Sequence, residues 1–253
     1  MTSQRLKDYE ITNALNIKLN VNEMKEYKAF LFDLNGTMID DMSYHLEVWY
    51  DMVVNKLGAA LTRDEVKNQL YGKNQDLLVR VFGKDHFTAE EMNKISLEKE
   101  MNYQRLYRPH LDLLPGLFSF LEKAKKSEIR MAIGSAAIPF NISFVLDNLR
   151  LNQYFDAIVS ADDVEHSKPH PETFLKAAND LNVAPSSCLV FEDAPKGVEA
   201  AENAGMKAIV LTTTHDQSDF KQYKNVLHFI KDYTELSTYF EQSSTGNIAM
   251  TGA

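Results

Sequence analysis

The sequence predicts an α/β fold, a parallel sheet with a small all-helical insertion after its first strand. Apolar runs such as Ala29–Phe32 and Cys188–Phe191 show no polar alternation, which is typical of strands buried on both faces of a parallel sheet. After Pro115, such runs alternate with helical patterns, which indicates βαβ units with right-handed crossovers. Between residues 41 and 111, apolar residues recur at helical spacing instead. We therefore expect this stretch to be the insertion.

The first part of the chain is predicted to contain an extension, one strand and the insertion. Residues 1–26 are polar and of mixed charge, so we expect an extension that packs loosely on the domain. The first buried strand follows at about 28–34. The helices predicted for the insertion run from Asp41 to Gly58, from the capping pair Thr62 and Glu65 onward, and over 75–82 and 88–108.

The second part of the chain alternates between helices and strands. The predicted helices lie at about 116–126, 141–149, 171–181 and 196–204. The predicted strands lie at about 129–135, 155–160, 188–192, 208–212 and 226–230, and a terminal helix follows the last of them. These elements place a core domain at 27–40 and 112–241, the insertion at 41–111 and a flexible tail at 242–253.

Composition narrows the class of protein. With 253 residues, 44% of them hydrophobic and 25% charged, the chain suits a large folded domain with a smaller insert. Its net charge of −9 argues against a nucleic-acid or membrane partner. The single cysteine, Cys188, lies in an apolar stretch, so we expect a buried thiol and no internal disulfide. The chain has no apolar run of about 20 residues and no apolar N-terminal segment. We therefore expect a cytoplasmic enzyme, and we expect it to be a monomer.

Four short polar clusters share one placement, at or just beyond the carboxyl end of a predicted strand. They are Asp33–Thr37, Gly134–Ala137, Ser167–Pro171 and Phe191–Gly197. Open α/β sheets bind their ligands at this edge. Each cluster by itself has an ordinary structural explanation, such as a turn, a helix cap or an exposed lysine in a loop. Their common placement favours a single site.

Side chains of the first three clusters suit the binding and transfer of a phosphoryl group. Asp33 can serve as a nucleophile and as a metal ligand, and Gly36 lets the backbone turn close to an anion. The Ser135 hydroxyl at a strand end suits a phosphate oxygen. Lys168 can hold a phosphate as a point charge.

The fourth cluster contains two adjacent acids, Glu192 and Asp193, directly after a buried strand. Such acids are costly to bury unless they are paired or bind a metal. Their hard oxygen ligands favour Mg²⁺, and a bound cation can attract a phosphorylated substrate to an acidic chain. The ordinary alternative is a helix N-terminus at which the helix dipole favours acids.

In these four clusters the chain resembles the haloacid dehalogenase (HAD) superfamily, in particular its β-phosphoglucomutase-like branch with a helical cap. The resemblance extends over about residues 27–240 and implies a HAD-like, Rossmann-like core with the insertion as a cap over the site. It implies that Asp33 forms an aspartyl-phosphate and that Ser135 and Lys168 bind the transferring phosphoryl group. It also implies a Mg²⁺ ion held by Asp33, Glu192, Asp193 and the main-chain carbonyl of Asn35. The residues expected to bind substrate beside them are Gly36, Thr37 and Ala136.

The resemblance continues in the predicted cap. His45 and Trp49 match residues of the first cap helix of β-phosphoglucomutases, and Lys99 resembles a cap lysine that faces the sugar phosphate. Gln75 stands where that branch typically has an arginine for a second phosphate, so the bidentate guanidinium is missing. We expect His45, Gln75 and Lys99 to bind substrate. The structural alternatives are a cap-core role for Trp49 and surface positions for His45 and Lys99.

Asn35 is the main departure from the family pattern. The phosphatases and mutases of the family have an aspartate here, which protonates the leaving oxygen and then activates water or a sugar hydroxyl. An amide of similar shape cannot exchange a proton, and general acid–base catalysis is typically worth about 10²–10⁴-fold in rate. The carbonyl ligand to the metal is retained.

The resemblance therefore implies a Mg²⁺-dependent phosphohydrolase, slow because of Asn35, that acts on a small phosphorylated metabolite such as a sugar phosphate. The alternatives are a β-phosphoglucomutase and a catalytically impaired protein that binds a phosphorylated ligand. The sequence leaves open whether Asn35 is natural or an engineered substitution that traps an active enzyme. A dehalogenase is less favoured because Ser135, Lys168 and the acidic pair suit phosphate and metal.

Overall fold

The computed structural model of the chain describes residues 26–237. Nearly all of the expected N-terminal extension lies outside the described residues, as do the expected tail and the region after Ser237, where the terminal helix was expected to continue.

The core is a six-stranded sheet in which every neighbouring pair of strands is parallel. The strands lie in the order β3-β2-β1-β4-β5-β6, so β1 pairs with β2 on one side and β4 on the other. Their bounds are β1 Ala29–Phe32, β2 Arg130–Gly134, β3 Ala157–Val159, β4 Cys188–Glu192, β5 Lys207–Leu211 and β6 Val226–Ile230. All six predicted strands are present, and the predicted parallel α/β fold is confirmed.

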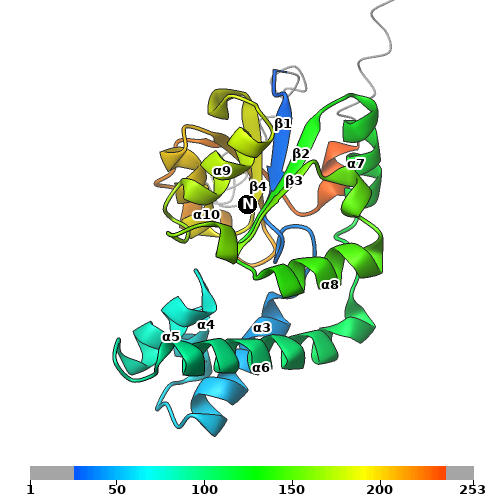
Figure 1. Ribbon diagram of the computed structural model, residues 1–253. Helices are drawn as coiled ribbons and strands as arrows, with labels where there is room; N and C mark the ends of the chain where they lie inside the picture. Colours follow the sequence, from blue (N-terminus) through cyan, green and yellow to red (C-terminus); the bar gives the residue numbers. More distant parts are fainter. Residues whose placement is uncertain (1–25, 238–253) are drawn as a thin grey trace, which may run out of the picture.

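Helices cover both faces of this sheet (Figure 1). Because side chains alternate along a strand, Phe30 and Phe32 belong to one buried apolar cluster, whereas Ala29 and Leu31 belong to the other. The first cluster contains residues of α7 and α8, and the second contains residues of α9 and α10. These helices are α7 Leu117–Lys126, α8 Pro139–Leu149, α9 Glu172–Asp180 and α10 Pro195–Asn203. Covering on both faces explains the uninterrupted apolar run of β1.

The helices between β1 and α7 lie at one end of the sheet (Figure 1). They are α3 Met42–Tyr50, the π-helix Asp51–Lys56, α4 Arg63–Lys67, α5 Asn74–Phe82 and α6 Ala89–Tyr107. The predicted capping box of Thr62 and Glu65 is present at the start of α4. The division of the chain into a core and a cap that closes over it stays a prediction.

Hydrogen bonds join this helical insertion to the loop between β3 and α9. The Lys73 ammonium donates to the carbonyl of Val164 at 2.6 Å. The Ser167 hydroxyl donates to Oδ2 of Asp76 in α5 at 3.0 Å. Both bonds end on the loop that carries Lys168, so the position of the insertion is coupled to that residue.

Two helical segments differ from the expectations. The helix predicted up to Gly58 is α-helical only to Tyr50 and continues as the π-helix. Gly58 follows with a φ of +77°, a left-handed conformation that glycine adopts without strain. After β6, the described chain forms the short 3₁₀ turn Tyr233–Leu236 at the start of the expected terminal helix. Further 3₁₀ turns are Arg108–His110, Asn152–Tyr154, Ala161–Asp163, Pro185–Ser187 and Gln217–Phe220. None of the described helices combines the length and apolar character needed to cross a membrane.

Phe32 is the aromatic anchor directly before Asp33, and it stacks on Phe191 with 4.7 Å between ring centroids. Since the side chain is fully buried, we expect Phe32→Ala to lower the free energy of unfolding by about 3–5 kcal/mol. Urea denaturation followed by circular dichroism measures the change. Phe140→Ala is the matched control, because that ring is 45% exposed and its removal should change stability by no more than about 0.5 kcal/mol. Equal losses in both variants would contradict the assignment of Phe32 to the core.

Candidate active site

The strand registers bring three of the four polar clusters to one level of the sheet. The last residue of β1, Phe32, pairs with Ile133 of β2 and with Phe191 of β4. The residues that follow these three along the chain, and so emerge together at the carboxyl edge, are Asp33, Gly134 and Glu192. The remaining cluster joins them from the loop before α9, because the Lys168 ammonium reaches Asp33.

A cavity of about 150 Å³ lies where this edge faces the helical insertion. The core residues that line it include Asp33, Asn35, Ser135, Ala136, Glu192 and Asp193. The insertion residues that line it include His45, Trp49, Lys73, Asn74, Lys99 and Glu100. Because polar groups face the cavity from both parts, a molecule bound there would contact the core and the insertion at once.

Lys168 places a positive charge beside Asp33. Its ammonium donates to Oδ1 of Asp33 at 2.6 Å and to Oε1 of Glu192 at 2.7 Å. Burial by itself would lower the pKa of Lys168, but the carboxylates of Asp33 and Glu192 outweigh this effect and raise the pKa. The ammonium therefore stays charged in the buried site.

The carboxyl groups around Lys168 outnumber it. Burial raises the pKa of Asp33 to about 7; the charge of Lys168 opposes this rise, and that of Glu192 adds to it. Burial likewise raises the pKa of Asp193 well above its usual range, and the nearby Glu192 and Asp33 add to the effect. Three buried carboxyl groups thus share one ammonium, which leaves the site short of positive charge.

The Glu192 side chain is fixed by the turn that follows β4. Its Oε2 accepts the backbone N–H groups of Asp193 at 3.0 Å and Ala194 at 3.1 Å. Gly197 at the start of α10 provides the space, because a Cβ atom there would lie 1.8 Å from Oε1 of Glu192. Both oxygens of the Glu192 carboxylate therefore have partners, Oε1 the Lys168 ammonium and Oε2 the backbone N–H groups.

Asn35 is held by a buried carboxylate. Its Nδ2 donates to Oδ2 of Asp41 at 2.6 Å and lies 3.1 Å from Nε2 of His45. Asp41 is fully buried and also accepts the Gly36 N–H at 3.2 Å and the Tyr103 hydroxyl. The amide of Asn35 therefore supplies one of the donors that this carboxylate needs.

Lys99 is buried at the cavity wall of the insertion. Its ammonium donates to both carboxylate oxygens of Glu100 at 3.0 Å and lies 2.6 Å from Nδ1 of His45. Burial lowers the pKa of Lys99, although the charge of Glu100 opposes the shift. Glu100 also accepts the amides of Asn74 in α5 and Asn141 in α8. This network joins the insertion to the core beside the cavity.

Residues 30–211 match the family model described as "Haloacid dehalogenase-like hydrolase". The chain belongs to the haloacid dehalogenase-like hydrolases. The match spans the insertion and all four polar clusters, so their family resemblance is confirmed.

Relatives of this hydrolase include enzymes of sugar-phosphate chemistry. A β-phosphoglucomutase of Bacillus subtilis is 32% identical over 189 residues, 72% of this chain and 82% of the relative. A fructose-1-phosphate phosphatase of Escherichia coli is 29% identical over 198 residues, 73% of this chain and 96% of the relative. Among solved structures, a family IA HAD hydrolase of Entamoeba histolytica is 29% identical with a TM-score of 0.75, and the alignment covers 85% of this chain and 98% of that one.

The structure of this hydrolase gathers most of the predicted site residues around the cavity. Asp33, Asn35, Ser135, Ala136, His45, Lys99, Glu192 and Asp193 line it, and Lys168 bonds to two of them. Trp49 also lines the cavity, and its ring lies 5.4 Å from the Lys99 ammonium. His45 and Lys99 are buried, so the alternative that they are surface residues is wrong.

Three of the predicted substrate-binding residues, Gln75, Thr37 and Gly36, lie outside the cavity lining and contact other parts of the protein. Gln75 lies outside the cavity lining and donates to Asn93 at 3.0 Å. Its neighbour Asn74 lines the cavity instead, because one residue turns the direction of a helical side chain by about 100°. Thr37 is fully buried, and its hydroxyl donates to Oδ1 of Asp193 at 3.3 Å. Thr37 thus positions the Asp193 carboxylate, and a contact of Thr37 with substrate stays a prediction.

Gly36 also has a packing role rather than an open face toward the cavity. Its φ is +72°, and a Cβ atom there would lie 2.2 Å from Oδ2 of Asp193. The same carboxylate accepts the Thr214 hydroxyl. Glycine is therefore required at this position both by the backbone conformation and by the close approach of Asp193.

Sequence reasoning missed the buried partners of the site. Asp41 holds Asn35 and accepts the Tyr103 hydroxyl, Glu100 holds Lys99, and Thr214 holds Asp193. The adjacent acids at 40 and 41 were a visible signal, because one of them directly precedes an apolar helix face. Thr214 lies 21 residues beyond Asp193 and offered no signal. It comes close only because β5, which it follows, pairs with β4, which Asp193 follows.

The residues at the carboxyl edge fit a hard divalent cation. Asp33 and Asp193 offer carboxylate oxygens, and Asn35 offers its main-chain carbonyl, which are the ligand types that Mg²⁺ takes in proteins. The deficit of positive charge among three buried acids is the observation that favours a cation here. Glu192, which was also expected to ligate the ion, is oriented by Lys168 and backbone N–H groups instead.

The excess of buried negative charge has a consequence for stability. Asp193→Asn cannot carry the charge; its one oxygen can accept from one of the hydroxyls of Thr37 and Thr214, and its NH2 group can donate to the other. In EDTA we expect the variant to exceed the wild type by about 1 kcal/mol or more in the free energy of unfolding. Mg²⁺ should then raise the unfolding temperature of the wild type and not that of the variant. The control is Asp162→Asn, an exposed acid. A less stable Asp193→Asn protein in EDTA would contradict the charge imbalance.

Proposed function

We propose that this chain is a Mg²⁺-dependent phosphohydrolase that removes the phosphoryl group from a small phosphorylated metabolite, with Asp33 as nucleophile. The observation that carries the proposal is the placement of Asp33, which lines the cavity, bonds to Lys168 and stands at the same edge as Ser135 and Asp193. A sugar phosphate is the substrate class that fits best, because the names of several relatives specify phosphorylated carbohydrates.

The proposed reaction has two steps at Asp33. In the first, a carboxylate oxygen attacks phosphorus, and the bond between phosphorus and the substrate oxygen breaks as the bond to Asp33 forms. Water then attacks the aspartyl-phosphate, which releases phosphate and restores the carboxylate. Lys168 and the Ser135 hydroxyl would bind the phosphoryl oxygens and hold them in line with Asp33.

Mg²⁺ would be held by Asp33, Asp193 and the Asn35 carbonyl, and when bound it supplies charge that offsets the phosphoryl oxygens. Lys168 keeps Asp33 oriented, because the same ammonium is anchored by Glu192. The raised pKa of Asp33, about 7, means that the ionised nucleophile depends on positive charge in the site. A cation next to Asp33 would lower that pKa again.

Asn35 determines which leaving groups the proposed enzyme can expel. Its amide cannot protonate the leaving oxygen, so that proton comes from water, and substrates with good leaving groups such as acyl phosphates should react fastest. The amide is complementary to Asp41, whereas a carboxylate at position 35 would face it at hydrogen-bond distance. Asparagine at position 35 therefore satisfies the buried Asp41 carboxylate, which an ionised aspartate would repel.

A β-phosphoglucomutase activity is the second candidate. It is supported by His45 and Lys99, which line the cavity, and by the Bacillus subtilis relative. It is opposed by Asn35, which cannot transfer a proton, and by Gln75, which turns away from the cavity. A protein that binds a phosphorylated ligand without turnover is the third candidate, supported by Asn35 alone.

A phosphate-release screen over sugar phosphates, acyl phosphates and pyrophosphate, with Mg²⁺ or EDTA, tests the proposal. We expect release only with Mg²⁺, and we expect Asp33→Asn to abolish it because the amide is a far weaker nucleophile that can still accept from Lys168. Asp40→Asn, an exposed neighbour, should behave like the wild type. Undiminished release by Asp33→Asn would contradict the covalent mechanism. If no protein releases phosphate but the ligand binds in a metal-dependent way, the binding protein is favoured.

Asn35→Asp supplies the proton carrier that is missing from the proposed site. The new carboxyl would lie beside Asp41, which raises its pKa and keeps it protonated as an acid. We expect turnover of sugar phosphates to rise by up to about 10²–10⁴-fold, measured as kcat on the same panel. Asn68→Asp, an exposed position, should leave turnover unchanged. A fall in turnover would instead point to chemistry that needs the amide. Intact mass and peptide mapping check that Asn35 has not deamidated.

A further inference from the structure

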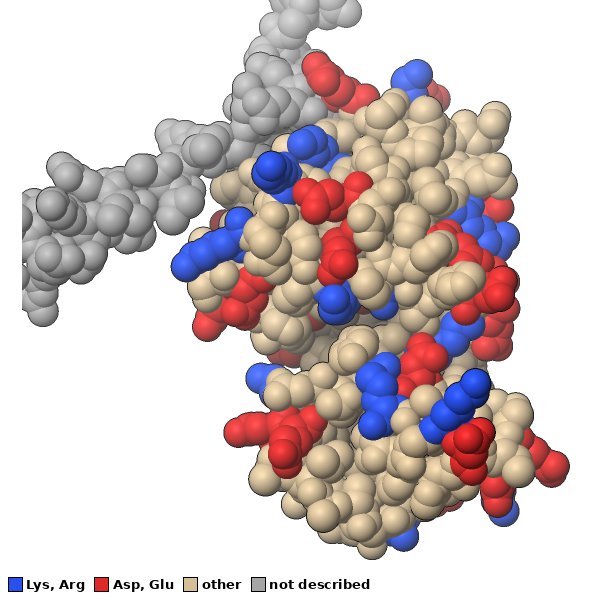
Figure 2. Space-filling model, turned by 90° about the vertical axis from the view of Figure 1, so that its left-hand side faces the viewer, with Lys and Arg blue, Asp and Glu red and all other residues tan. Residues whose placement is uncertain are grey.

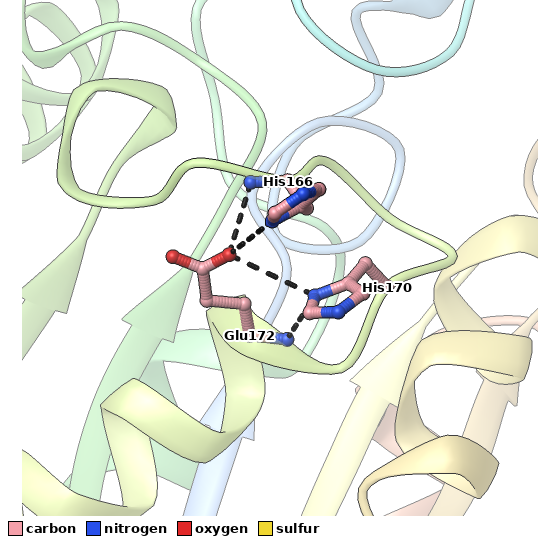
Figure 3. A group of neighbouring side chains, drawn as sticks. All are labelled: His166, His170 and Glu172. Atoms are coloured by element: carbon pink, nitrogen blue, oxygen red, sulfur yellow. Dashed lines mark hydrogen bonds and ion pairs between the residues drawn. The ribbon is translucent and has the colours of Figure 1, made fainter.

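Two histidines and a glutamate converge on the loop that carries Lys168. Nδ1 of His166 lies 3.2 Å from Oε2 of Glu172, and Nδ1 of His170 lies 3.7 Å from the same oxygen. All three ligand atoms lie within 4.8 Å of one another. Figure 3 shows both imidazole rings turned toward this one carboxylate oxygen, and each side chain is about half exposed.

The separations match those around a small tetrahedral ion. Two ligands of Zn²⁺, each bonded at about 2.0–2.1 Å, stand about 3.3–3.4 Å apart. The two distances from Oε2 of Glu172 to the imidazole nitrogens, 3.2 and 3.7 Å, bracket this value. Imidazole and carboxylate ligands together suit Zn²⁺ and its neighbours Ni²⁺ and Cu²⁺, whereas Mg²⁺ prefers oxygen ligands alone.

The Glu172 carboxylate is held in place without an ion. The Glu172 carboxylate accepts the backbone N–H groups of Glu165 at 2.8 Å and His166 at 2.9 Å, so its position at the start of α9 is fixed. The imidazoles are not needed for this bonding. The rings of His166 and His170 lie side by side with 4.6 Å between their centroids. An ion would therefore bind without rebuilding the loop.

We propose that His166, His170 and Glu172 bind a divalent transition-metal ion, with Zn²⁺ as the best fit, and that the ion clamps the loop that carries Lys168. The two histidines flank Lys168 at a distance of two residues on each side. The same loop receives the helical insertion through the bonds of Lys73 to Val164 and of Ser167 to Asp76. An ion here would restrict the motion of the loop, and so of Lys168 and of the hydrogen bonds between the loop and the insertion. Three protein ligands leave one position open for water.

Titration of the full chain with Zn²⁺ against a chromogenic chelator, in excess Mg²⁺, tests this site. We expect the wild type to bind Zn²⁺ and the double variant His166→Ala/His170→Ala to bind it about 100-fold more weakly or worse, because it loses two of three ligands. His110→Ala, an exposed histidine elsewhere, should bind like the wild type. Glu172 is left unchanged because its carboxylate also holds the loop backbone.

A second measurement separates this site from the cavity carboxylates. Zn²⁺ should slow hydrogen exchange of the backbone amides in the loop 164–170 in the wild type and in Asp193→Asn, but not in the double histidine variant. Equal Zn²⁺ affinity in the wild type and the double histidine variant would overturn the proposal, as would no Zn²⁺ binding by the wild type. Binding that disappears in Asp193→Asn and persists in the double histidine variant would place the ion at the carboxyl edge and overturn it as well.

Discussion

The rest of the site depends on the two ion pairs that the Lys168 ammonium forms with Asp33 and Glu192. It ties together three separate parts of the chain: the end of β1, the end of β4 and the loop before α9. Because all three side chains are buried, water cannot replace the ammonium as the partner of either acid. Gly197 in the first turn of α10 leaves the space that Glu192 occupies in this arrangement.

Charge imbalance follows from the same arrangement. One ammonium cannot neutralise Asp33, Glu192 and Asp193, and the raised pKa values of Asp33 and Asp193 express the excess. A site of this kind is less stable than an uncharged core, and the proposed cation would offset the surplus of carboxylates. Asn35 limits the excess, since its amide adds a donor to Asp41 where an aspartate would add a fourth acid near Asp33.

The loop between β3 and α9 connects the carboxyl edge of the sheet with the insertion. It presents Lys168 to the core, accepts from Lys73 through the Val164 carbonyl and donates to Asp76 through the Ser167 hydroxyl. It also turns His166 and His170 toward Glu172. On the face drawn in Figure 2, acidic and basic side chains are interspersed over both the core and the insertion. This face therefore carries no field of one sign, whereas Lys99 and His45 are buried at the cavity.

The sequence by itself determined the sheet, its helices and the order of the polar clusters. Unbroken apolar runs such as Ala29–Phe32 specify buried parallel strands, and residues at their carboxyl ends must share one edge. Asp33, Ser135, Lys168 and Asp193 could be named for that reason. The helix 75–82 could be placed from periodicity, but periodicity leaves the rotation of a helix about its axis unspecified. The family resemblance placed Gln75 in the cavity, but the rotation of this helix brings Asn74 there instead.

Only the tertiary structure decided which polar groups satisfy one another. Asp41 reaches Asn35 from six residues away, Glu192 pairs with Lys168 from 24 residues away, and Thr214 reaches Asp193 across the β4–β5 crossover. Such partners are selected by distance in space and by the need of each buried charge for a donor, and neither quantity is encoded in local spacing. The chemistry of the site could be predicted from residue types, whereas its electrostatic balance could not, because that balance depends on burial.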